Sequence, residues 1–184
     1  MTRARDLILL LAAGTAAWAQ KPEPAATLIS DSVIQDVLKK TAQAQVSDTA
    51  LQVAGIKGEY NVEIAIVHRA NTHGQATGGA IEHDDLTEVY HVISGTGTLV
   101  TGGKISGAKR LDPEGQTVKL LAGPGSSGNA ITGGVSRKIG PGDVIVIPPD
   151  VAHWFSEISP TEIVYLVVRI DPHKVLPAGY SIKP

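Results

Sequence analysis

Residues 142–155 read GDVIVIPPDVAHWF and predict a strand, a rigid corner and the start of a second strand. A Gly-Asp turn opens the β-branched run 144–147, which favours an extended conformation. Two consecutive prolines end this strand, because proline cannot donate to a β-ladder. The next strand then begins at His153, just past the corner, and alternation places Phe155 on the same face as His153.

A second stretch, residues 83–97, reads HDDLTEVYHVISGTG. Its two consecutive aspartates favour a turn, so the chain reverses after His83 and brings Glu88 back beside it at the start of the next strand. From Glu88 onward, alternation places Tyr90 on the same face and His91 on the opposite face. We therefore expect His83, Glu88 and Tyr90 to lie close together.

Most of the chain after residue 49 consists of short runs rich in Val, Ile, Thr and Tyr, divided by Gly, Pro and Asp. This pattern predicts an all-β body, and the number of strands favours a sandwich or a barrel. The expected strands are 51–56, 60–69, 79–83, 88–93, 97–101, 144–147, 153–157 and 162–170. The glycine-rich stretch 102–141 is expected to be a long loop that either shapes the mouth of a pocket or is a mobile surface insertion.

The N-terminal part divides into two segments. Residues 1–19 combine Arg3 and Arg5, an apolar run over 7–13 and small residues up to Ala19, which is typical of a secretory signal peptide. Residues 20–48 are expected to hold one packing helix over 30–45, because apolar residues recur there at helical spacing. A single domain would then span 49–184. An uncleaved membrane anchor is the alternative interpretation of the leader.

Composition limits the partners and ligands of the chain. There is no cysteine among the 184 residues, so disulfides and thiolate metal sites are excluded and any metal must take nitrogen and oxygen ligands. Removing the leader takes away two of 16 basic and one of 18 acidic residues, which leaves 14 against 17. Nucleic acid is therefore not an expected partner. We expect a periplasmic or secreted protein with no membrane contact after cleavage of the leader.

The two stretches quoted above resemble the two sequence motifs of the cupin family over roughly residues 79–155. This resemblance implies a double-stranded β-helix, or jelly roll, with the N-terminal helix packed on it. The matching positions are His83, Glu88, Gly95, Gly142, Pro148 and His153. The chain departs from the family pattern at Ile81, where the family has a first histidine, and at Asp150, where it has a glycine.

The resemblance implies that His83, Glu88 and His153 are metal ligands. Two imidazoles and one carboxylate form a facial triad that leaves coordination positions open, and iron, manganese, nickel or zinc would fit such a set as one divalent ion. The alternative is a metal-free barrel whose polar residues bind an organic ligand. His68 ends the alternating run 60, 62, 64, 66 and is a candidate additional ligand.

Two functions follow from these residues. One is a small-molecule metalloenzyme, dioxygenase-like or isomerase-like, with Tyr90 as a candidate catalytic residue; Tyr90 and Phe155 are expected either to line the pocket or to pack in the core. The other is a non-catalytic module for binding or storing a small ligand; the sequence does not decide between them. A homodimer is compatible with both, since Val89, His91 and Trp154 point away from the expected site.

Overall fold

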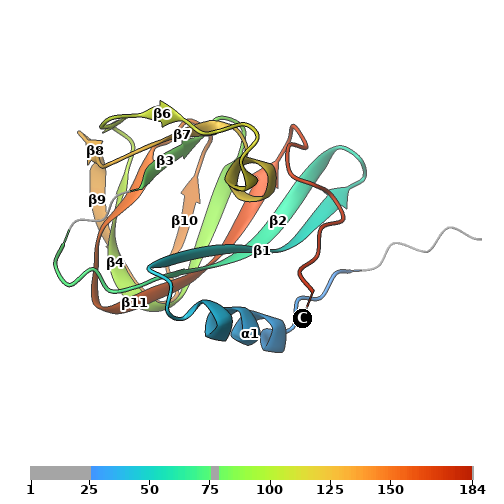
Figure 1. The fold of residues 1–184 in the computed structure, drawn as a ribbon, viewed down its shortest axis with the longest axis horizontal. Helices are drawn as coiled ribbons and strands as arrows, with labels where there is room; N and C mark the ends of the chain where they lie inside the picture. Colours follow the sequence, from blue (N-terminus) through green and yellow to red (C-terminus); the bar gives the residue numbers. More distant parts are fainter. Residues whose placement is uncertain (1–25, 76–78, 184) are drawn as a thin grey trace, which may run out of the picture.

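The computed structural model describes residues 26–75 and 79–183, so the predicted signal peptide lies outside the described residues. The fold is all-β with one N-terminal helix, as the sequence predicts (Figure 1). Within the described ranges, no helix is long and apolar enough to cross a membrane. The elements are α1 (Asp31–Thr41), β1 (Val46–Ile56), β2 (Tyr60–Arg69), β3 (Ala80–His83), β4 (Thr87–Thr101), β5 (Lys104–Ile105), β6 (Lys109–Arg110), η1 (Val118–Ala122), β7 (Gly125–Gly128), β8 (Ile131–Thr132), β9 (Val135–Ile139), β10 (Val144–Ile147) and β11 (His153–Asp171).

Two long antiparallel strands, β4 and β11, form the frame of a barrel (Figure 1). Residues 87–95 of β4 pair with 163–170 of β11, and 97–101 pair with 153–158, so both strands run through two parts of the sheet. The sequence predicted two strands in place of each of these, and this prediction was wrong. Gly95 explains the continuity of β4: its φ of 76° permits the bend, and a Cβ there would lie 1.7 Å from the carbonyl oxygen of Glu162.

The remaining strands close the barrel around this frame. On one side, β1 pairs with β2 and β2 pairs with β11; on the other, β9 and β10 both pair with β4. The strand β3 meets β11 at the pair Ile81 and His153, and continues to β7. These antiparallel pairings form the double-stranded β-helix expected from the sequence.

The barrel interior is built in layers of residues from facing strands. One layer is charged and contains Glu63, Glu88 and Arg169, whereas the next layers are apolar and aromatic. The largest buried core cluster belongs to these apolar layers and includes Tyr90, Phe155 and Tyr165. A charged layer inside an otherwise apolar barrel marks the place where polar chemistry can occur.

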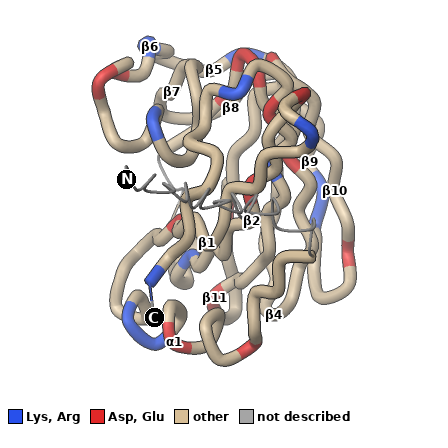
Figure 2. Tube along the Cα trace, turned by 90° about the vertical axis from the view of Figure 1, so that its right-hand side faces the viewer, with Lys and Arg blue, Asp and Glu red and all other residues tan. Residues whose placement is uncertain are grey.

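The helix α1 covers the outside of the sheet. Val37 packs with Leu51, Ile66 and Val164 in a separate buried cluster, so both faces of β2 are covered. Asp31 in the first turn and two lysines in the last turn complement the helix dipole. In the view of Figure 2, positions of Lys and Arg are interspersed with those of Asp and Glu over the described trace and gather in no basic stripe.

The segment 102–141 is more ordered than the long loop predicted from its glycines. It contains five short strands and one turn of π-helix, η1. Thr117, Leu121 and Ala122, from this turn and the residue before it, line the pocket described below. Of the two interpretations of this segment, shaping the pocket is therefore the one that the structure favours.

Candidate metal centre

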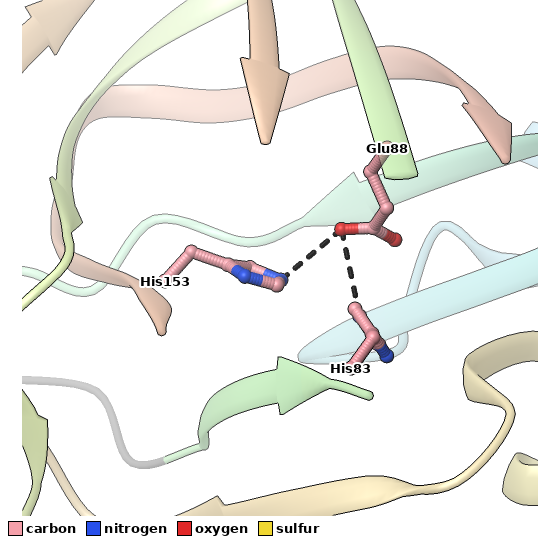
Figure 3. Close-up of side chains that lie close together, drawn as sticks. All are labelled: His83, Glu88 and His153. Carbon is pink, nitrogen blue, oxygen red and sulfur yellow. Dashed lines mark ion pairs between the residues drawn. The ribbon is translucent and has the colours of Figure 1, made fainter. Parts of the chain in front are cut away.

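Three strand ends bring His83, Glu88 and His153 together. His83 is the last residue of β3, Glu88 is the second residue of β4 and His153 is the first residue of β11. Their side chains point toward one another inside the barrel (Figure 3), and all three are buried. Glu88 Oε2 lies 3.5 Å from His83 Nε2 and 3.1 Å from His153 Nε2.

The corner at Pro148 and Pro149 joins the two halves of this site. The backbone N–H of Asp150 donates to the carbonyl oxygen of His83 at 2.8 Å, so the corner before β11 is bonded to the end of β3. Asp150 has a φ of 60°, in the left-handed region where the cupin motif has glycine. Aspartate tolerates this conformation better than most residues, which explains how the departure from the motif is accommodated.

The hydrogen bonds of the two imidazoles fix which nitrogens face the site. His83 Nδ1 lies 2.8 Å from the carbonyl oxygen of Ala122, and His153 Nδ1 lies 3.0 Å from that of Val151. A carbonyl oxygen only accepts, so each Nδ1 carries a proton and donates it. In the neutral imidazoles, both Nε2 lone pairs then face the carboxylate of Glu88. Metal-binding histidines are oriented in the same way, by a hydrogen bond from the ring nitrogen that does not face the metal.

The separations fit one cation between these atoms. Two lone pairs and a carboxylate oxygen repel one another unless a proton or a metal ion lies among them. Ligand atoms about 2.1 Å from a common ion stand roughly 3.0 to 3.4 Å apart for angles between 90° and tetrahedral. The two measured separations, 3.1 and 3.5 Å, are close to this range, and all three candidate ligand atoms lie within 4.8 Å of one another. The donor set therefore fits a divalent ion.

Behind Glu88, a buried arginine holds the carboxylate in place. Arg169 Nε donates to Glu88 Oε1 at 2.8 Å, and its Nη groups donate to Glu63 and Asp48, each at 2.5 Å. Oε1 is thus occupied by Arg169 while Oε2 faces the imidazoles. Three carboxylates surround one guanidinium, which leaves a surplus of negative charge that a divalent cation would offset.

Burial and the surrounding charges shift the acid–base behaviour of this network. Burial raises the pKa of Glu88, but the charge of Arg169, together with the charge and hydrogen bonds of the imidazoles when they carry a proton on Nε2, outweighs burial and holds that pKa well below its usual range. Burial also raises the pKa of Glu63, and because Arg169 offsets only part of this effect, the value reaches about 7. Glu88 is therefore ionised near neutral pH, whereas Glu63 titrates there.

Tyr90 contacts the same carboxylate. Its hydroxyl donates to Glu88 Oε2 at 2.9 Å, and its ring meets the ring of His153 edge-on with centroids 6.2 Å apart. Burial raises the pKa of Tyr90 well above its usual value, and the charge of Glu88 raises it further. Tyr90 is therefore protonated near neutral pH and acts on the site as a hydrogen-bond donor.

A pocket of about 400 Å³ opens onto these residues. Ile81, which stands where the cupin motif has its first histidine, lines this pocket together with Val46, Val67 and Leu121. The wall beside the three polar groups is therefore apolar. With no fourth protein ligand at Ile81, the donor set leaves room for a ligand at the centre. This volume suits one small organic molecule.

The structure separates the other candidate residues from this group. His68, the candidate additional ligand, does not join the group: its Nε2 pairs with Glu162 Oε2 at 2.9 Å, while Glu63, Val67 and Arg69 face the interior from β2. Tyr90 lines the pocket, one of the two places expected for it. Phe155 is buried in the core against Tyr165, with ring centroids 5.6 Å apart, and is not among the residues that line the pocket.

Sequence reasoning missed four charged residues that surround the site: Asp48, Glu63, Arg69 and Arg169. A signal was present for two of them, because Glu63 and Arg169 each interrupt an apolar run of a long strand. A charge at such a position is costly unless it is paired, so each of these two required a partner inside the barrel. Which residues pair with which depends on strand register, which the sequence alone does not give.

Comparison with known proteins gives structural likenesses only. No protein-family model matches the chain, and no curated protein matches it. A double-stranded β-helix protein of Klebsiella pneumoniae has a TM-score of 0.45 at 13% identity, over 72% of this chain and 82% of that one. BH2720 of Bacillus halodurans has a TM-score of 0.44 at 13% identity, over 88% and 89% of the two chains. A cupin-like protein of Thermotoga maritima has a TM-score of 0.41 at 18% identity, over 72% of both chains.

Proposed function

We propose that this chain is an exported small-molecule enzyme, an oxidoreductase or an isomerase, that binds one divalent metal ion through His83, Glu88 and His153. One observation carries the proposal: two imidazole lone pairs and an ionised carboxylate converge in a buried pocket at the spacing of ligands on a single ion. Iron, manganese, nickel and zinc all accept this donor set. Export is proposed from the leader pattern of residues 1–19.

The protein groups around the ion would have separate tasks. When bound, the ion supplies Lewis-acid or redox chemistry to an oxygen atom of the substrate. Arg169 keeps Glu88 oriented and ionised, and the backbone carbonyls of Ala122 and Val151 keep both imidazoles in the ligating tautomer. The hydroxyl of Tyr90 holds a proton within hydrogen-bond distance of Glu88 and can donate it to a substrate oxygen.

Metal content tests this proposal directly. The chain from residue 20 onward, purified without a histidine tag, is loaded with metal, dialysed and measured by elemental mass spectrometry. We expect close to one divalent ion per chain in the wild type and almost none in His153→Ala. His91→Ala is the matched control, because His91 lies on β4 but is exposed on the outer face. A folded wild-type protein that binds no ion after reconstitution would exclude the metalloenzyme.

Turnover separates the enzyme from a binding module. If the ion is bound, the zinc-loaded and iron-loaded proteins are tested against a panel of small oxygen-containing molecules by oxygen uptake and by NMR detection of isomerised product. Metal-dependent turnover that is lost in His153→Ala supports the enzyme. Stable metal and ligand binding without any turnover would favour the non-catalytic alternative.

The homodimer predicted from Val89, His91 and Trp154 remains a prediction.

A further inference from the structure

Arg69 is a second arginine of the pocket and has no role in holding Glu88. It is the last residue of β2 and follows Glu63 and Val67 on the inward-facing side of that strand. Its side chain lines the same pocket of about 400 Å³ as His83, Glu88 and His153. A ligand in that pocket would therefore contact both Arg69 and the proposed metal centre.

Two aromatic residues hold the guanidinium of Arg69 in position. Its Nε donates to the hydroxyl of Tyr165 at 2.9 Å, and its Cζ lies 5.3 Å from the centre of the Phe155 ring. Stacking on a ring and one hydrogen bond fix the orientation of the planar group. The hydrogen bond uses one of the five N–H groups, so the four on Nη1 and Nη2 remain for other partners.

Arg69 differs from Arg169 in its charge balance. Arg169 is paired with three carboxylates, whereas in residues 26–75 and 79–183 no carboxylate forms an ion pair with Arg69. The nearby Asp48 is bound by Arg169. A half-buried cation without an anion is costly, and a ligand that brings the anion would relieve this cost.

The charge of the whole pocket points the same way. With a divalent ion bound and the network ionised, three carboxylates face two guanidiniums and two metal charges, which leaves one positive charge. One carboxylate on the ligand neutralises it. The planar Nη1–Nη2 edge of a guanidinium matches the two oxygens of a carboxylate, which favours this anion over a tetrahedral one.

We infer that Arg69 binds the carboxylate of a small organic acid whose other end faces His83, Glu88 and His153. The inference rests on the proposed function for the second half of that statement, and it names the substrate class: small carboxylic acids. The apolar wall formed by Val46, Val67 and Ile81 suits a short hydrocarbon segment between the two polar ends.

Calorimetric titration with succinate tests the inference on the wild-type protein. Succinamide, its neutral diamide, has nearly the same size, and inorganic phosphate serves as the tetrahedral anion. We expect zinc-loaded protein to bind succinate at least about tenfold more tightly than succinamide, because the diamide loses both the charge-assisted hydrogen bonds to Arg69 and the charge that faces the ion; the Arg69 variants below separate the two effects. It should also bind phosphate more weakly than succinate. Equal affinity for acid and amide, phosphate binding as tight as succinate binding, or no succinate binding would overturn the inference.

Variants assign the effect to Arg69. Arg69→Gln should weaken succinate binding at least about tenfold while zinc content is unchanged, and Arg69→Lys should lie between the two because it keeps the charge without the planar fork. Arg137→Gln is the control, since it removes the charge of an exposed arginine on β9. Unchanged affinity in Arg69→Gln contradicts the inference. If Arg69→Gln does not fold, the succinate affinity of Arg69→Lys and the difference between succinate and succinamide affinity in the wild type decide whether Arg69 binds the carboxylate.

The same titration on metal-free protein separates this inference from the proposed function. Without metal, the wild type should bind succinate more weakly than the zinc-loaded form but still more tightly than Arg69→Gln does. If the chain binds no metal at all, the proposed function fails while a dependence on Arg69 still supports the arginine site. If zinc binds and Arg69→Gln leaves the affinity unchanged, the arginine site fails and the metal centre stands.

Discussion

Replacing Glu63 with Gln tests the charge balance behind the metal centre. Glu63 is fully buried, Arg169 Nη1 donates to its Oε1 at 2.5 Å, and its Oε2 is buried without a hydrogen-bond partner among the described residues. This environment raises the pKa of Glu63 from its ordinary 4.5 to about 7. Gln keeps the acceptor for Arg169 and nearly the same volume, but it cannot ionise.

The sign of the pH dependence follows from this raised pKa. Between pH 4.5 and 7 the folded protein binds a proton at Glu63 that the unfolded chain has released, so folding becomes less favourable as the pH rises. The stabilisation is complete below pH 4.5 and is lost as the pH rises through about 7. The difference between the two pKa values corresponds to about 3 kcal/mol of unfolding free energy.

Urea unfolding of metal-free protein at several values between pH 4.5 and 8 measures this effect. We expect the wild type to lose about 3 kcal/mol relative to Glu63→Gln across that range. Glu59→Gln, in the exposed turn before β2, controls for the loss of one negative charge. If the unfolding free energy of the wild type relative to that of Glu63→Gln stays constant or rises with pH, the raised pKa of Glu63 is contradicted, since Arg169 would then fully compensate the ionised carboxylate.

Three further predictions concern Arg169, Gly95 and Tyr90. Arg169→Met should lower the unfolding free energy at neutral pH by about 3–5 kcal/mol, because it leaves buried carboxylates without their counter-ion; urea unfolding at the wild-type midpoint would contradict this. Gly95→Ala should lower the unfolding free energy, measured by thermal unfolding, by about 2 kcal/mol or more, because the added Cβ would lie 1.7 Å from a backbone oxygen. Gly142→Ala is the control: Gly142 has a φ of 88° but open space around it, so this substitution should lower the unfolding free energy by only about 1 kcal/mol. Tyr90→Phe should weaken metal binding by about tenfold in competition with a chromogenic chelator, because Glu88 loses a hydrogen-bond donor; unchanged affinity would show that this hydroxyl does not support the carboxylate.

The meeting of His83 and Glu88 could be predicted because local turn chemistry governs it, whereas the place of His153 beside them followed only from the resemblance to the two cupin motifs. Two aspartates reverse the chain between the first two residues, and two prolines place the third at the start of a strand. These signals depend on residues close in sequence. The tautomers of the imidazoles could not be predicted in the same way, since Ala122 belongs to a segment far from His83 in the sequence.

The inward phase of β2 could not be predicted, and the reason is physical. Alternation identifies the interior only when one face of a strand is polar. Ile64 and Ile66 are apolar because α1 packs on them from outside, while Ala65 and Val67 are apolar because they face the core. With both faces covered, the sequence offered two equivalent choices, and for this reason His68 stayed a candidate for the interior until the structure placed it against Glu162.

Anomalous X-ray diffraction from crystals grown with zinc, recorded above and below the zinc absorption edge, tests whether His83, Glu88 and His153 hold an ion. We expect one strong anomalous peak inside the barrel, about 2.0–2.2 Å from Nε2 of His83, Nε2 of His153 and Oε2 of Glu88. A barrel without such a peak, or a zinc ion held by other residues while these three stay bonded only to one another, would contradict the proposed metal centre.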